Sequence, residues 1–499
     1  MIGSGHHGLV AALRLGARGH EVLVLEAASA PGGAVRSAEL TLPGFTHDTC
    51  AGFFPLTAAS PAFADLELDL GWINPPVPMV HVLHDQGDEI ALHRDLAATV
   101  DSLEACAPGA GAGWGQLMRT LWPHREALTR VALARMPPLR ATAILLARLR
   151  TRAFELAPMA PASSASLGSD LFAGSDRAAA WLAGSGAHAD LSPRAAGSGA
   201  FSLGLNFLAH AVGWPFPRGG AGRLTDALVA GVRRHGGEVR CGAEVSYIEP
   251  RGGRAAALRL SDGERIGADA VICTASPGPL ARMLPAGAFP GRVERRLRRW
   301  RYGLGTVKLD YALSAAVPWR GPRAREAAVV HVGGPLDELA ASLEQAAAGV
   351  FPDRPALVVG QQSLHDPLRA PDGQHTLYVY ARVPQQPALA DDEMAERIEH
   401  RIEQFAPGFR ALIRARAVRS PAAIEAENPS LRGGDLASGS CELDQQLVFR
   451  PAPELCRCRT PLRGLYIAGG WVHPGPGVHG VSGRAAADAL LSDLRRRRI

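Results

Sequence analysis

Lysine is almost absent from this chain. Of its 53 lysine and arginine residues, Lys308 is the only lysine, although the net charge of +5 is modest. Alanine, glycine and arginine dominate throughout, which indicates a compositional pressure on the coding sequence, so the abundance of arginine alone identifies no partner. No basic stripe interleaved with aromatic residues accompanies it, and we therefore expect no nucleic-acid binding.

Paired cysteines and long apolar runs are also missing. The seven cysteines are scattered and include no C-x-x-C pair, which disfavours a disulfide scaffold, a dithiol relay and a metal site. An apolar run such as 141–147 is far shorter than the ~20 residues that cross a bilayer as a helix. The chain opens directly on a glycine motif, without the basic region of a signal peptide, so we expect a cytoplasmic protein.

The glycine motif at the start has a recognised chemical use. Gly3, Gly5 and Gly8 fit the pattern G-x-G-x-x-G and open a predicted helix. The first glycine permits a tight turn, the second lets the backbone approach a pyrophosphate, and the third allows the helix to pack closely on a strand. A β-rich run at 21–25 then ends at Glu26, where an acidic side chain accepts hydrogen bonds from ribose hydroxyls. The combination predicts a dinucleotide site.

One departure from the usual pattern concerns the strand before this motif. Only Met1 and Ile2 precede Gly3, whereas a strand of about five residues normally leads into such a turn. We therefore expect upstream residues to complete that strand.

Two further glycine segments point to the same ligand. Gly32 and Gly33 follow Glu26 closely and allow a second backbone approach to the cofactor, while Arg36 is in reach of phosphate or flavin. Near the end of the chain, 464–480 reads as a strand and a glycine loop before a helix, whose N-terminus can stabilise negative charge on a reduced flavin. The loop residues predicted to contact the cofactor are Gly469, Gly470, Gly477 and Val478.

The distribution of these motifs predicts an α/β fold with a discontinuous Rossmann-type FAD-binding domain and an interleaved α+β substrate domain. The FAD-binding domain is predicted at 1–75, 214–288 and 436–499. The substrate domain is predicted at 76–213, which reads as helical, and at 289–435.

Taken together, these motifs resemble the phytoene desaturase-like group of flavoprotein oxidoreductases, which is related to carotenoid desaturases and ketolases and to the amine oxidase superfamily. The resemblance lies at both ends of the chain and hardly touches 80–200. It implies non-covalent FAD, an apolar substrate tunnel, and adenine contact through the backbone of Val245. Further segments that carry it are 217–222, 428–435, 443–445, 450–451 and 473–475.

Lys308 lies in 305–313, a run that alternates as a β-strand does. A chain that otherwise uses arginine should keep lysine only where a compact ammonium or a neutral amine is needed. The stretch also resembles the strand on which related amine oxidases place a lysine that holds a water near flavin N5. We therefore predict that Lys308 is a catalytic residue beside the flavin.

The leading hypothesis is an FAD-dependent oxidoreductase that dehydrogenates or isomerises a hydrophobic, carotenoid-like substrate, with oxygen or a quinone as electron acceptor. An FAD-dependent amine or small-molecule oxidase is one alternative. A flavin-bound regulatory or interaction protein with little turnover is another. A long apolar tunnel would favour the polyene, and a short tunnel with an aromatic cage would favour the amine.

Two arginine-rich stretches, 130–152 and 292–301, are candidates for a surface that contacts a membrane. A basic, partly apolar helix can rest on an anionic membrane, where a polyene substrate would be found. The sequence allows two interpretations of these stretches, peripheral membrane contact and an ordinary solvated, ion-paired face. The basic tail 495–498 is expected simply to lie at a helix C-terminus, where positive charge is favourable.

Overall fold

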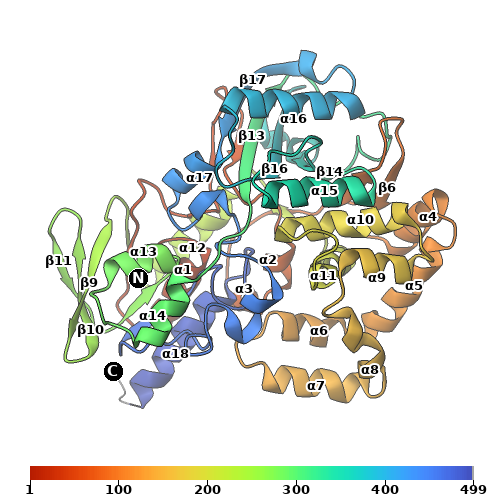
Figure 1. Cartoon of the computed structure of the whole chain (residues 1–499). Coiled ribbons are helices and arrows are strands. Elements are labelled where there is room, and N and C mark those ends of the chain that lie inside the picture. The colour runs from red at the N-terminus through yellow and green to blue at the C-terminus, as the bar shows by residue number, and fades with distance from the viewer. Residues whose placement is uncertain (497–499) are drawn as a thin grey trace.

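The computed structural model of the chain describes residues 1–496, so Arg497 and Arg498 of the basic tail lie outside the described residues. A parallel sheet, a seven-stranded mixed sheet, a three-stranded antiparallel sheet and a group of helices make up most of the molecule. The antiparallel strands of 245–267 lie at one side and the helices of 125–156 at the opposite lower edge (Figure 1). In the described part of the chain, no helix combines the length and apolarity needed to cross a membrane.

A parallel sheet gathers strands from distant parts of the chain. Strand β1 (Leu23–Leu25) pairs with β8 (Glu238–Arg240), and β12 (Val271–Cys273) pairs with β18 (Leu465–Ile467). Ile2 forms parallel bridges to both Leu25 and Cys273, which joins the two pairs into one sheet. The beginning, middle and end of the chain therefore meet in a single layer.

Three helices pack around this sheet. Helix α1 (His6–Gly16) contacts both α12 (Gly222–Arg234) and α18 (Val481–Arg495). Helix α1 is almost entirely buried, because small and branched apolar side chains follow one another along it. Antiparallel strands β9 (Val245–Arg251), β10 (Arg254–Leu260) and β11 (Arg265–Gly267) extend from the same half of the molecule.

A seven-stranded mixed sheet has the order β17–β13–β16–β15–β14–β5–β6. Helix α16 (Asp391–Phe405) packs against one face and α10 (Asp176–Gly186) against the other, so both faces are buried. The strand expected at 305–313 is confirmed as β13, and all nine of its residues are buried because both faces of the sheet are covered. The strands are β5 (Met79–Val82), β6 (Glu89–Leu92), β13 (Gly305–Leu313), β14 (Val329–Val332), β15 (Leu357–Gly360), β16 (His375–Val383) and β17 (Ile413–Arg419).

The segment 76–213 is largely helical, as expected, but it also contributes β5 and β6 to the mixed sheet. Each of these strands is four residues long; they pair with each other, and pairing of β5 with the distant β14 joins them to the rest of the sheet. The helices are α4 (Leu96–Cys106), α5 (Ala110–Leu121), α6 (Arg125–Ala132), α7 (Leu139–Leu149), α8 (Arg152–Leu156), α9 (Ser164–Leu171), α10 (Asp176–Gly186) and α11 (Ser198–Ala211).

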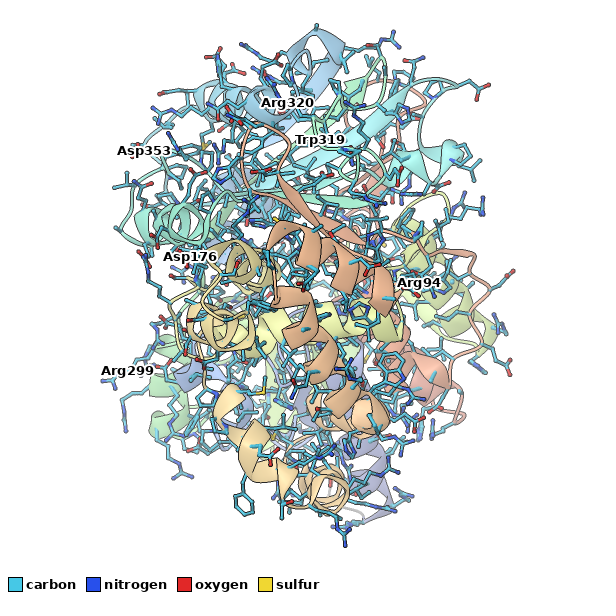
Figure 2. The ribbon with its side chains drawn as sticks, turned by 90° about the vertical axis from the view of Figure 1, so that its right-hand side faces the viewer. Arg94, Asp176, Arg299, Trp319, Arg320 and Asp353 are labelled. Carbon is cyan, nitrogen blue, oxygen red and sulfur yellow. The ribbon has the colours of Figure 1, made fainter. Side chains whose placement is uncertain are left out.

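Short helices complete the fold between these layers. They are α2 (Pro55–Ala59), α3 (Pro61–Ala64), α13 (Pro277–Met283), α14 (Gly291–Arg298), α15 (Leu336–Ala347) and α17 (Pro421–Glu427). Helix α14 carries much of the second arginine-rich stretch, and Arg299 just beyond it points away from the protein (Figure 2). Arg292 and Arg296 pair with Glu454 at 3.2 and 2.7 Å, which accounts for part of this stretch as an ion-paired surface.

Candidate functional site

A large cavity connects the parallel sheet with the helices of 76–213. Its volume is about 1640 Å³, which exceeds the ~300–1,000 Å³ typical of small-molecule pockets. One end is lined by Gly5, Glu26 and Val245, and the other by apolar side chains such as Leu149 and Phe201. The cavity therefore has room for a dinucleotide and a second, apolar molecule.

The three glycines of the first motif have different surroundings. Gly3 has a φ of +91°, and a Cβ there would overlap the hydroxyl of Thr274. A Cβ at Gly8 would overlap the carbonyl oxygen of Gly3, so this glycine lets α1 approach the turn. Gly5 lines the cavity, and within the described chain a Cβ there would meet no atom within 4 Å.

The start of α1 suits an anionic group. The N-cap residue, Gly5, offers no side chain to the free backbone N–H groups of the first turn. Such groups, together with the helix dipole, form a site for phosphate. The open space beside Gly5 is thus where a pyrophosphate fits.

Glu26 is held rigidly beside this turn. One carboxylate oxygen accepts hydrogen bonds from the Ser4 backbone N–H at 2.8 Å and the Ser4 hydroxyl at 2.6 Å. The other accepts from the Ala28 N–H at 3.0 Å. Glu26 lines the cavity, as does Val245, so the predicted ribose and adenine contacts share one end of it.

The second glycine segment packs against the first. Gly32 donates from its N–H to the Ser4 carbonyl at 3.1 Å, and a Cβ at Gly33 would lie 3.3 Å from the Cα of Gly5. Gly33 and Arg36 line the cavity, whereas Gly32 supports the loop behind them. The Nε atom of Arg36 is buried and has no hydrogen-bond partner within residues 1–496, so its N–H is available to donate to an anionic ligand.

The C-terminal loop closes the same end of the cavity. Gly469, Gly470, Gly477 and Val478 all line it. Ser482 at the start of α18 accepts from the Gly469 N–H at 3.0 Å and lies 3.0 Å from His7 Nδ1, which links the first turns of α18 and α1.

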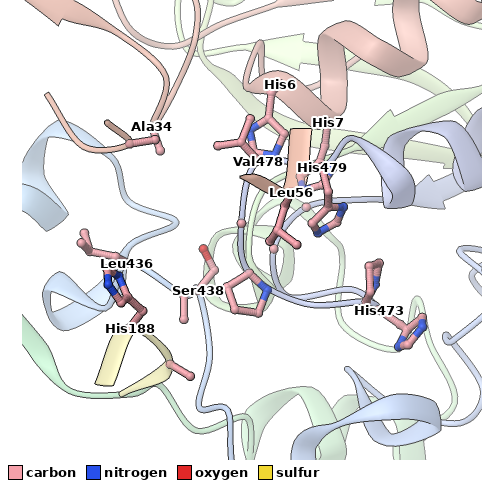
Figure 3. Close-up of a pocket in the computed structure, with 18 of the residues that line it drawn as sticks. His6, His7, Ala34, Leu56, His188, Leu436, Ser438, His473, Val478 and His479 are labelled. Carbon is pink, nitrogen blue, oxygen red and sulfur yellow. The ribbon is translucent and has the colours of Figure 1, made fainter. Parts of the chain in front are cut away.

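A cluster of imidazoles surrounds this junction (Figure 3). His6 and His7 have ring centroids 4.0 Å apart, and His7 and His479 are 4.9 Å apart. Burial lowers the pKa of His6 to about 3 and that of His479 to about 4, so these rings are neutral at physiological pH. The cluster is therefore a polar but uncharged lining.

These residues fit FAD. In the described chain, the open cradle at Gly5, the rigid carboxylate of Glu26 and the unpartnered Arg36 Nε border the same cavity of about 1640 Å³. When bound, FAD supplies an isoalloxazine ring that accepts a hydride. The residues named above would hold and orient it.

Lys308 lies near the cavity but not among the described residues that line it. Its Nζ atom is 2.5 Å from an Asp310 carboxylate oxygen and 4.9 Å from the centre of the Tyr378 ring, and its side chain is only 2% exposed. Burial lowers the pKa of Lys308, and Asp310 opposes that shift. The lysine thus forms a buried ion pair next to the wall residue Tyr378, and its catalytic role stays a prediction.

Several polar wall residues were not predicted from the sequence. Tyr378, Tyr380 and Arg382 alternate along β16, and all three line the cavity. Tyr380 Oη lies 2.8 Å from Nδ1 of His188, another wall residue, which stands opposite His6 and His7 in Figure 3. The alternating pattern of 376–382 was the available signal, but nothing local indicated which face would meet the cavity.

Comparison with known proteins agrees with this geometry. The profile of the family described as flavin containing amine oxidoreductase matches residues 8–491. Hydroxyneurosporene desaturase from Cereibacter sphaeroides is 29% identical over 100% of this chain and 98% of its own length. Mouse pyridine nucleotide-disulfide oxidoreductase domain-containing protein 2 is 27% identical over 56% of this chain, and the match spans 52% of that relative, about half its length.

Solved structures show the same fold. An oxidoreductase from Methanosarcina mazei has a TM-score of 0.63 at 16% identity and covers 98% of this chain and 99% of its own. Cyclohexylamine oxidase from Brevibacterium oxydans has a TM-score of 0.61 at 15% identity and covers 99% and 98%. The predicted α/β class and FAD as cofactor are confirmed. The chain belongs to the flavin-containing amine oxidoreductase family.

Proposed function

We propose that this protein uses FAD to dehydrogenate a long, hydrophobic, carotenoid-like substrate. The observation that carries the proposal is the apolar arm of the cavity, which leads from the cofactor end to α7 and α11. Its walls include Leu121, Leu133, Leu149, Phe201, Leu205 and Phe207. The full-length similarity to a hydroxyneurosporene desaturase supports the same class of substrate.

The wall residues suggest how such a substrate would be bound and oriented. An extended hydrocarbon gains free energy by leaving water along the apolar arm, at about 25 cal/mol per Å² of buried apolar surface. At the inner end, Tyr378 and Tyr380 are stacked with ring centroids 6.1 Å apart, which offers a flat surface for a polyene. Orientation would thus come from shape, because an unfunctionalised hydrocarbon offers no group for ionic recognition.

Amine oxidation is the second candidate. Cyclohexylamine oxidase shares the fold, and Tyr378 and Tyr380 place aromatic rings on the cavity wall. Arg382 lies on that wall with its guanidinium 4.9 Å from the Tyr380 ring centre, however. Its charge is offset by Asp190, which lies 2.5 Å away, so this part of the wall offers no unpaired anion to a protonated amine, and we favour the uncharged substrate.

The cavity mouth supports delivery of that substrate from a membrane. Leu146 on α7 and Leu443 and Leu447 on a distant loop line the cavity and are also exposed. On α7 and α8, Leu139 is 73% exposed and Phe154 is 82% exposed. We call these five side chains the apolar rim. Exposed arginines lie beside them on the same helices, at positions 140, 148 and 152, a combination that suits an anionic bilayer surface.

Oxygen or a quinone is the electron acceptor that we propose. A quinone dissolved in the bilayer would reach the flavin through the same mouth as the substrate.

Anaerobic half-reactions test the proposed function. The purified holoprotein would be mixed with vesicles containing phytoene, or with cyclohexylamine, while the absorbance of oxidised flavin is followed. We expect phytoene to bleach the flavin and to yield a product with a longer conjugated system, and cyclohexylamine to leave the spectrum unchanged. Bleaching by cyclohexylamine alone would favour the amine oxidase. Stable oxidised flavin with both compounds would favour a protein with little turnover.

A further inference from the structure

Arg450 is fully buried behind the C-terminal loop of the cofactor end. Its guanidinium donates to the Gly470 carbonyl oxygen from Nε at 3.0 Å and from Nη2 at 2.9 Å. The same side chain donates to the carbonyl oxygens of Ala437, Gly439 and Ser440, at 3.1, 3.3 and 2.9 Å. Gly470 and Ala437 line the cavity, so one side chain joins two segments of its wall.

The positive charge of Arg450 has no ion-pair partner within residues 1–496. Its five hydrogen bonds all go to neutral carbonyl oxygens, and no carboxylate pairs with the guanidinium. Arg369 is buried to a similar degree, but it is paired with Asp48 at 2.7 Å and with Asp366 at 3.2 Å. Because a buried charge without a counter-ion is unfavourable, the surroundings of Arg450 suit a ligand that brings negative charge.

Four ionisable groups lie within reach of this cation. Burial lowers the pKa of Arg450, while Cys441 and Asp435 raise it. The Asp435 carboxylate accepts hydrogen bonds from three backbone N–H groups instead of from the guanidinium. Burial lowers the pKa of His473 and of His479 to about 4, and the charge of Arg450 lowers both further. Since both rings line the cavity, the field of Arg450 extends to the cofactor end (Figure 3).

The order of groups along FAD relates this loop to the flavin ring. We expect the adenosine beside Glu26 and the pyrophosphate beside Gly5, so the ring continues past Gly5 along the cavity wall. The C-terminal loop borders the cavity there, and its residue Val478 lies beside the start of α1 in Figure 3. The loop that Arg450 holds is therefore the part of the wall that we expect next to the ring.

We propose that Arg450 is a positioning residue whose positive charge stabilises the reduced form of the bound flavin. Reduction by a hydride adds two electrons and one proton to the flavin ring, which then carries one net negative charge. An arginine side chain keeps its own charge in a protein interior. The attraction between the two charges exists only after reduction, and a water-poor site strengthens it. Arg450 thus raises the midpoint potential of the flavin from behind the loop, whatever the substrate is.

The midpoint potential of bound FAD tests this proposal without any substrate. Holoprotein would be reduced by dithionite at neutral pH in the presence of reference dyes. Arg450→Gln removes the charge but keeps amide donors, and it should weaken binding of reduced relative to oxidised FAD at least tenfold. For a two-electron couple, this is a fall of about 30 mV in midpoint potential. Arg450→Lys keeps the charge but loses most of the hydrogen bonds, and its ratio should stay within threefold of wild type.

Trp300→Phe is the matched control. Trp300 Nε1 donates to the Ser438 carbonyl at 3.2 Å, and its ring centre lies 5.4 Å from the Arg450 guanidinium carbon. The substitution loosens the same wall segment without altering a charge and should keep the ratio within threefold of wild type.

Three results would overturn the proposal. An equal fall in potential in Trp300→Phe and Arg450→Gln, or in both Arg450 variants, would mean that the position of the loop and not the charge sets the potential. An unchanged potential in Arg450→Gln with at least tenfold weaker binding of oxidised FAD would assign the charge to the pyrophosphate. An unchanged potential with unchanged binding would leave the charge without a role toward FAD.

A second measurement leaves Arg450 in place, in case its variants do not fold. Free reduced flavin loses its second proton near neutral pH, whereas flavin stabilised as an anion binds only one proton on reduction over the whole neutral range. The potential should then fall by about 30 mV per pH unit, compared with about 60 mV for uptake of two protons. Asp190, with a pKa of about 7, would add a proton of its own, so Asp190→Asn is measured beside wild type. The smaller slope in either protein supports the proposal, and the larger slope in both would overturn it.

Discussion

Arg382 Nε lies 2.5 Å from an Asp190 carboxylate oxygen, and both side chains are buried beside the cavity. Burial raises the pKa of Asp190 to about 7, although Arg382 lowers it, and Asp435 adds to the rise. The pair connects β16 with the segment that follows α10. Because the pKa of Asp190 is about 7, the charge of this ion pair changes near neutral pH.

This pairing predicts a pH-dependent stability difference. Because the ordinary aspartate pKa is 3.8, folded Asp190 binds more protons than unfolded Asp190 between pH 3.8 and about 7. Its contribution to the free energy of unfolding therefore falls as the pH rises through that window. The Tm of the Asp190→Asn variant minus the Tm of wild type should increase from about pH 5 to about pH 7 and stay constant at higher pH. Thermal melts with a constant difference across that range would contradict the assignment.

Gly5 provides the test of the cofactor site. Its φ of −61° and ψ of 164° suit any residue, and a Cβ would project into the cavity without touching the described chain. Gly5→Val should therefore fold but lose FAD, because the side chain occupies the pyrophosphate position, and its Tm should match that of wild type stripped of FAD. Gly267→Val is the matched control, since Gly267 lies in equally open space on β11 outside the cavity. Full flavin content in the Gly5 variant would refute the site.

The cofactor end of the cavity could be predicted because its determinants are local. The spacing of three glycines and Glu26 dictates a turn, a helix and an acid at a strand end, and Gly3, Gly5 and Glu26 line the cavity. The opposite wall could not be predicted in the same way. His188 meets Tyr380 only because α10 packs across the mixed sheet, a contact between residues 192 positions apart.

A substitution at Lys308 distinguishes a structural role, as the partner of Asp310 in a buried ion pair, from a catalytic role. Removing the ammonium in Lys308→Met leaves the buried Asp310 with Arg419, at 3.1 Å, as its remaining cation. We expect the free energy of unfolding to fall by about 3 kcal/mol, as when one partner of a buried pair is lost. Chemical denaturation measures this loss, and flavin reduction by phytoene is measured on the same sample. Unchanged stability with at least tenfold slower reduction would instead favour the catalytic role predicted from the sequence.

The apolar rim predicts membrane binding. A large apolar side chain contributes about 1.5–3 kcal/mol when it leaves water, so Phe154→Asp should weaken binding to anionic vesicles at least tenfold. Leu368→Asp is the control, because Leu368 is 62% exposed but lies outside the apolar rim. Vesicle flotation measures both variants. Equal binding by the Phe154 variant and wild type would contradict membrane contact through the apolar rim.

The apolar arm itself is tested most directly at Gly204. This residue lies on α11 and lines the cavity, and within the described chain a Cβ there would meet no atom within 4 Å. Gly204→Phe should keep its FAD yet reduce the rate of anaerobic flavin reduction by phytoene at least tenfold, because the ring occupies the substrate path. Gly267→Phe should match wild type. A Gly204→Phe protein that is reduced by phytoene at the wild-type rate would contradict the claim that this arm holds the hydrophobic substrate.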